Sequence, residues 1–89
     1  MRFVVLIEYT DMDARNRALE AHKAYLAAGR EAGVVAESGA FADAKGGMVV
    51  LELPDEAAAQ AFVAADPYRT QANLKMTIRQ WNSVRGKTP

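Results

Sequence analysis

The 89-residue sequence contains no cysteine and only one histidine. The lack of cysteine excludes disulfides and thiolate metal sites. With a single histidine, a zinc site would need carboxylates for all its remaining ligands, which zinc sites in proteins seldom use. We therefore expect no metal, and nothing in the sequence implies an organic cofactor. Because so small a domain buries only part of its surface, we expect further burial to come from association of identical copies.

The sequence also lacks an excess of charge of one sign and any long apolar run. Eleven basic and eleven acidic residues cancel, so no overall field attracts nucleic acid or an anionic membrane surface. The apolar run at 3–7 is too short for a signal peptide, and no later run could span a bilayer. We expect a single cytoplasmic domain over residues 1–89, with neither a nucleic-acid nor a membrane partner.

Hydrophobic patterning predicts an alternation of strands and helices. Apolar runs and period-two alternation predict four strands, at residues 2–9, 34–41, 48–53 and 74–84. Three-and-four spacing of apolar residues predicts two helices, at about 14–32 and at 55–65. A turn that includes Gly46 and Gly47 joins the middle strands into a hairpin, and Ser38-Gly39 is a candidate bulge. The predicted fold is α+β, the ferredoxin-like βαββαβ arrangement: an antiparallel four-stranded sheet with two helices on one face.

The first and third predicted strands are apolar on both of their faces. Val4 and Leu6 alternate with Phe3 and Val5, for example, and all four are apolar. Two helices can cover only one face of the sheet, so the other would expose a patch larger than soluble monomers usually carry. We expect a homodimer in which two such sheet faces pack together.

His22 is the residue that best suits chemistry at neutral pH. It lies on the apolar face of the first predicted helix, four residues from both Ala18 and Leu26, and an ordinary histidine titrates near neutrality. Asp66 follows the second predicted helix, where the helix dipole and partial burial would disfavour its charge. Because both helices pack side by side on one sheet face, the two side chains can plausibly meet. A carboxylate bonded to one imidazole nitrogen would leave the other nitrogen free to move a proton.

Each of these residues also has a structural interpretation. A lone histidine on an apolar face is most often a core residue with one satisfied partner. Aspartate before proline is commonly a turn residue, and Tyr68 is more often a core or rim aromatic than a ligand contact. Ser38 beside a glycine is usually a bulge residue without a nucleophilic role. Spacing alone leaves the function open.

The order of several short motifs resembles the YCII-related (YciI-like) family over nearly the whole chain. The motifs that carry the resemblance are Ala21–Leu26, Gly33–Val35, Ser38–Asp43, Gly47 with the strand after it, Ala57–Phe62, Asp66–Tyr68 and Ile78–Trp81. The resemblance implies a dimeric α+β barrel of ferredoxin-like protomers. It also implies an active site with a histidine–aspartate pair, which corresponds here to His22 and Asp66. Related α+β barrel enzymes act on small ring compounds, as lactone isomerases and a dehydrochlorinase do.

Residues and resemblance together suggest a small cofactor-independent enzyme. His22, oriented by Asp66, would transfer a proton on a small cyclic or aromatic compound, in an isomerase, lyase or dehydrochlorinase reaction. Ser38 and Tyr68 are expected to contact this substrate between the helices and the sheet. The alternative is a non-catalytic ligand-binding or accessory module that uses the same cleft. A haem-degrading monooxygenase with His22 as iron ligand is a third possibility, which the resemblance does not favour.

Overall fold

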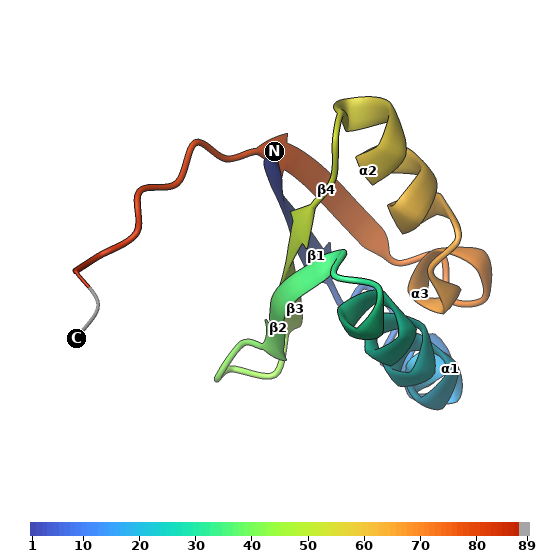
Figure 1. Cartoon of the computed structure of the whole chain (residues 1–89). Helices are drawn as coiled ribbons and strands as arrows, with labels where there is room; N and C mark the ends of the chain where they lie inside the picture. Colours follow the sequence, from blue (N-terminus) through green and yellow to red (C-terminus); the bar gives the residue numbers. More distant parts are fainter. Residues whose placement is uncertain (88–89) are drawn as a thin grey trace.

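The computed structural model describes residues 1–87 and consists of one sheet covered by helices on one face (Figure 1). The strands are β1 (Arg2–Glu8), β2 (Val35–Ala40), β3 (Gly46–Glu52) and β4 (Lys75–Gln80). The helices are α1 (Met12–Glu31), α2 (Glu56–Ala64) and the short α3 (Pro67–Thr70). The predicted α+β, ferredoxin-like order of strands and long helices is confirmed. The helix α3 was not predicted.

The sheet has the order β2-β3-β1-β4, and every neighbouring pair is antiparallel. Its helix-covered face carries the core, because alternate residues of the central strands point to that side. Phe3 pairs with Leu51 and Val5 with Val49, and all four are almost fully buried. The intervening residues of β1 and β3 therefore point to the opposite side, which we call the open face.

Helix α1 begins two residues earlier than the sequence pattern predicted. Asp11 is its N-cap, and the carboxylate of Asp11 accepts a hydrogen bond of 3.0 Å from the backbone N–H of Ala14. One stripe along the helix is buried against the sheet and the neighbouring helices. It consists of Ala14, Ala18, His22, Leu26 and Gly29. His22 is the central residue of this stripe, so its side chain is covered by the elements packed on α1.

Two glycines expected in the hairpin turn lie inside β3 instead. Gly46 pairs with Glu8, and Gly47 pairs with Ile7 and Ala40. A Cβ atom on Gly46 would collide with the backbone oxygen of Ile7, and one on Gly47 would lie 2.7 Å from the backbone oxygen of Gly39. The strands approach so closely here that only glycine fits.

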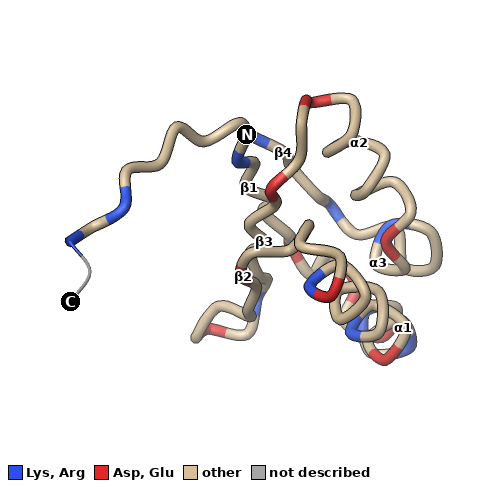
Figure 2. Tube along the Cα trace, in the orientation of Figure 1, with Lys and Arg blue, Asp and Glu red and all other residues tan. Residues whose placement is uncertain are grey.

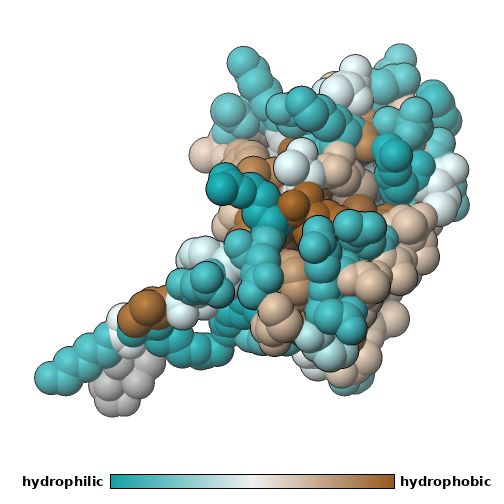
Figure 3. Space-filling model, turned by 90° about the horizontal axis from the view of Figure 1, so that it is seen from above, coloured by the Kyte–Doolittle hydropathy of each residue, from teal (hydrophilic) through white to brown (hydrophobic). Residues whose placement is uncertain are grey.

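The fourth strand is shorter than predicted, ending at Gln80 rather than at residue 84. Gln80 pairs with Phe3, and the next N–H, that of Trp81, donates to the oxygen of Arg2. Strand β1 begins at Arg2, so residues after Trp81 have no strand to pair with. The following residues leave the body of the molecule as an extended tail (Figure 1), which Figure 3 shows from above.

Charges of both signs lie along α1, whereas the charged residues of the tail among those described, Arg85 and Lys87, are both basic (Figure 2). Within residues 1–87, no helix combines the length and the apolar character needed to cross a membrane.

Candidate active site

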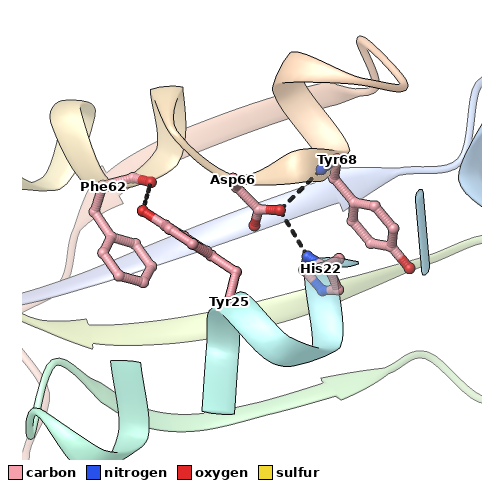
Figure 4. A network of polar contacts seen from close by, with 5 residues as sticks. All are labelled: His22, Tyr25, Phe62, Asp66 and Tyr68. Atoms are coloured by element: carbon pink, nitrogen blue, oxygen red, sulfur yellow. Dashed lines mark hydrogen bonds and ion pairs between the residues drawn. The ribbon is translucent and has the colours of Figure 1, made fainter. Parts of the chain in front are cut away.

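His22 and Asp66 meet in the buried space between α1 and the segment that joins α2 to α3 (Figure 4). The imidazole Nδ1 lies 2.8 Å from Oδ1 of Asp66. The His22 side chain is 9% exposed and that of Asp66 is 3% exposed, so water hardly competes for this contact. The structure therefore brings together the two side chains that the sequence analysis singled out.

The local environment of Asp66 differs from the one predicted. The residue does follow α2, but it is also the N-cap of α3, with Pro67 in the first turn. Its Oδ1 accepts a hydrogen bond of 2.9 Å from the backbone N–H of Tyr68. Asp66 follows the end of α2 as predicted, but the prediction did not include α3, whose first N–H groups face the carboxylate.

The hydrogen bonds around Asp66 fix the tautomer of His22. A carboxylate only accepts hydrogen bonds, so Nδ1 of the imidazole must supply the hydrogen of their shared bond. In a neutral ring this leaves Nε2 unprotonated, with a lone pair available as a base. Within residues 1–87, no side chain or backbone group makes a hydrogen bond to Nε2, and this nitrogen is not among the fully buried atoms without a partner.

The ring of Tyr68 stacks on one face of the His22 imidazole. The two rings are parallel to within 6°, with centroids 3.6 Å apart. The Tyr68 ring also packs edge-to-face with the ring of Tyr9, with centroids 6.0 Å apart. Burial, reinforced by the neighbouring Tyr9, raises the pKa of Tyr68 to about 12. Tyr68 therefore keeps its hydroxyl proton at neutral pH and can donate a hydrogen bond.

A cavity of about 530 Å³ opens beside the imidazole. This volume is within the range of small-molecule sites in proteins. Helix α1 forms one wall, and the ends of β2 and β3 form another. Three of the four residues proposed from the sequence line it, namely His22, Ser38 and Tyr68. Asp66 lies behind His22 and is not part of the lining, so it can act on a ligand only through the imidazole.

Ser38 reaches the cavity because of an irregularity in β2. The register of β2 on β3 shifts between Val35 and Glu37, so the bulge is at Ala36 and not at the predicted Ser38-Gly39. The shift turns Ser38 to the helix-covered side, where it pairs with Val49. Its hydroxyl oxygen lies 3.4 Å from Nη1 of Arg30, which donates to it.

Two further residues of the cavity wall, Arg15 and Tyr9, were not among the site residues proposed from the sequence. Arg15 precedes His22 by seven residues, a spacing that returns to the same helix face and could have indicated it. The Arg15 Cζ lies 4.7 Å from the centroid of the Tyr9 ring. Burial opposes the charge of Arg15, but the nearby hydroxyls of Tyr9 and Tyr68 outweigh this and raise its pKa. Arg15 is therefore a permanent positive charge at the site.

Tyr25 fixes the position of α1 relative to α2 near the site. Its hydroxyl donates a hydrogen bond of 2.6 Å to the backbone oxygen of Phe62 in α2 (Figure 4), and the two aromatic rings lie 4.7 Å apart. Burial and the nearby Asp66 carboxylate raise the pKa of Tyr25. The contact joins α1 to α2 one helical turn beyond His22, and this keeps α1 in position relative to Asp66.

No cluster of three or more histidine, aspartate or glutamate side chains suited to a metal ion occurs in residues 1–87. The polar groups of the cavity are an imidazole, hydroxyls, two guanidinium groups, a lysine and one glutamate. This set can bind an organic ligand, move a proton and stabilise negative charge.

Comparison with known proteins identifies the class. The sequence pattern described as the YCII-related domain matches residues 1–82, and the chain therefore belongs to the YCII-related family. A comparison with curated proteins finds no match. Among solved structures, the fold is similar to that of 5-chloro-2-hydroxyhydroquinone dehydrochlorinase (TftG) from Burkholderia phenoliruptrix AC1100, in complex with 2,5-dihydroxybenzoquinone. The TM-score is 0.76 at 21% identity, and the match covers 92% of this chain and 94% of that chain.

Proposed function

We propose that the protein is an enzyme that transfers a proton on a small cyclic or aromatic compound, with His22 as the acid–base group. The observation that carries the proposal is the arrangement of the imidazole. Nδ1 is bonded to the buried Asp66, and the ring lines a cavity of ligand size. A base held in one tautomer beside an open cavity is the arrangement that general acid–base catalysis needs.

The proposed reaction begins when Nε2 removes a proton from a carbon or oxygen of the ring compound. The bonding electrons stay on the substrate as an enolate or a new double bond, and the imidazolium is stabilised by the Asp66 carboxylate. The proton can then return to another atom, which is an isomerisation. Alternatively a leaving group departs with its electron pair and the imidazolium releases its proton to water, which is a lyase or dehydrochlorinase reaction. Both outcomes balance without an oxidant or a reductant.

The similarity to TftG supports a ring compound as substrate. That protein is named as a dehydrochlorinase of a chlorinated hydroxyhydroquinone, and its structure holds a dihydroxybenzoquinone. In the present chain, the parallel stack on Tyr68 holds the imidazole at the wall of the cavity. We propose that Ser38 and Tyr68 contact the substrate by donating hydrogen bonds to its ring oxygens, because both line the same cavity as His22.

The test is turnover by His22→Gln over a panel of ring lactones and chlorinated hydroquinones. Glutamine retains a polar side chain but cannot exchange protons at neutral pH, so we expect turnover to fall about 10²- to 10⁴-fold with an unchanged circular dichroism spectrum. A second variant, His22→Ala, should regain part of its activity when free imidazole is added. Equal turnover by wild type and both variants would refute the proposal.

A second candidate function is a ligand-binding module without catalysis. The observation in its favour is burial, since His22 is only 7% exposed and Tyr68 covers one face of its ring. On this hypothesis His22 mainly satisfies the buried Asp66. Ligand binding by wild type and His22→Gln alike, with no turnover by either, would favour this module over the enzyme. A cytoplasmic location stays a prediction, which cell fractionation tests.

A further inference from the structure

Arg15 holds a buried hydrogen-bond donor that the protein itself does not use. Its Nε is fully buried and has no partner among the residues described. Nη1 donates to Oδ1 of the neighbouring Asn16 at 3.0 Å, and the guanidinium lies over the Tyr9 ring. Buried donors in folded proteins are nearly always paired. Nε itself is out of reach of a ligand, but Arg15 is only partly buried and lines the cavity, so the guanidinium has further N–H donors that a ligand can pair with.

Arg15 also lacks a counter-ion. Four ion pairs occur within residues 1–87, and none of them includes Arg15. The one acidic residue of the cavity lining, Glu20, lies 3.7 Å from Lys23. Asp66 is turned away from the cavity and bonded to His22. The permanent charge of Arg15 therefore faces a cavity in which no carboxylate of the described protein neutralises it.

The wall between Arg15 and His22 is continuous. The guanidinium of Arg15 lies over the ring of Tyr9, Tyr9 packs edge-to-face with Tyr68, and Tyr68 stacks on the imidazole. A ring compound lying along this wall would present one end to Arg15 and the other to His22. The planar guanidinium, with parallel N–H donors, matches the two oxygens of a carboxylate better than it matches any uncharged group.

We propose that Arg15 is the anion-binding residue of this cavity, and that its ligand is a small ring compound bearing a carboxylate. The proposal names the substrate class of the proposed function and rests on that function only for the role of His22. Anion binding itself needs no turnover. Arg15 would fix the carboxylate end and so set which atom of the ring faces Nε2 of His22.

The experiment compares two ligands of nearly the same shape, 4-hydroxybenzoate and 4-hydroxybenzamide, by calorimetric titration and NMR. We expect wild type to bind the carboxylate about 10- to 100-fold more tightly, as a charge-assisted hydrogen bond predicts. Arg15→Gln should remove this preference. Arg17→Gln is the matched control, because Arg17 lies on the same helix, is exposed and does not line the cavity; it should keep the preference.

Further variants separate this proposal from the proposed function. Arg15→Lys keeps the positive charge but loses the two parallel N–H donors of the guanidinium, so it should keep only part of the preference for the carboxylate. A partial loss of this kind would also show that the preference depends on residue 15 and not on loss of the fold. His22→Gln should still prefer the carboxylate. If His22→Gln keeps full turnover, the proposed function fails and anion binding stands. Equal binding of both ligands by wild type, no binding of either at millimolar concentration, or an unchanged preference in Arg15→Gln would overturn the anion site.

Discussion

Asp66 uses one oxygen for two hydrogen bonds, one from His22 Nδ1 and one from the N–H of Tyr68. Asp66→Asn keeps an oxygen that can accept both, whereas Asp66→Ala leaves two buried donors unpaired. We expect the alanine variant to lose about 1–3 kcal/mol of the free energy of unfolding for each of the two buried donors that it leaves unpaired, and the asparagine variant clearly less. Urea unfolding measures both. Equal losses would contradict the expectation, because they would show that an acceptor oxygen without the negative charge does not preserve stability.

The same pair of variants tests the catalytic part of Asp66. Asparagine accepts the hydrogen bond from Nδ1 but offers no negative charge to an imidazolium. Asp66→Asn should therefore lower turnover by about 10²-fold or more, although its fold is kept. Steady-state rates of Asp66→Asn on the substrate that wild type turns over decide the point. Turnover close to that of wild type would mean that Asp66 only orients the ring.

The raised pKa of Tyr68 has a consequence for stability at high pH. Its pKa is about 12 in the folded chain, against an ordinary value of 10.0. Between these values the unfolded chain has lost the proton and the folded chain still holds it, so the free energy of unfolding falls as pH rises. Urea unfolding at pH 9, 10 and 11 should show this fall. Tyr68→Phe should show a smaller one, with the remainder due to Tyr25 and other groups; an unchanged slope would contradict the assignment.

At the scale of elements, patterning predicted all four strands and both long helices, because their apolar spacing is regular. The helix α3 was missed because four residues give no periodicity, and Asp66-Pro67 indicates a turn as readily as an N-cap. Ser38 was proposed near the site, but alternation could not place it on the helix-covered side, because that depends on the bulge at Ala36. Bulges depend on the partner strand and leave no regular pattern in the sequence.

The close approach of β1 and β3 predicts a strong position effect among the glycines. Gly46→Ala would force a Cβ into the backbone oxygen of Ile7, so we expect a loss of about 1–3 kcal/mol or more in the free energy of unfolding. Gly39→Ala is the matched control, because a Cβ on Gly39 would have no neighbouring atom within 4 Å. Thermal and urea unfolding compare the two variants. Similar losses in both would mean that β1 can move away from β3.

For the whole molecule, the open face leads us to propose a homodimer joined through the sheets. Val4 pairs with Val50 and Leu6 with Met48 on this face, and Leu6 is 37% exposed. Val50 is buried although it lies outside the main core. Ion pairs flank these apolar residues, with Arg2–Glu52 at one end and Glu8–Lys75 at the other. A second copy of the same face would cover the apolar strip and keep the charges at the rim.

Sedimentation at micromolar concentration tests the homodimer. Wild type should sediment as a dimer, and Leu6→Glu should be monomeric, because a charge would be buried in the middle of the joint surface. Ala28→Glu adds the same charge at an exposed position on α1, away from the open face, and should remain dimeric. A monomeric wild type would rule out the face-to-face arrangement.

Residue 68 contributes to the site through both its main chain and its ring, and the two can be varied independently. Any residue except proline retains the N–H that holds the carboxylate of Asp66, whereas only the side chain decides what lies 3.6 Å from the imidazole. Fluorinated tyrosines at position 68 would therefore lower the electron density of the ring that stacks on the imidazole in steps, while the carboxylate of Asp66 stays in position. A single codon thus offers a means of tuning reactivity that leaves the architecture of the catalytic pair untouched.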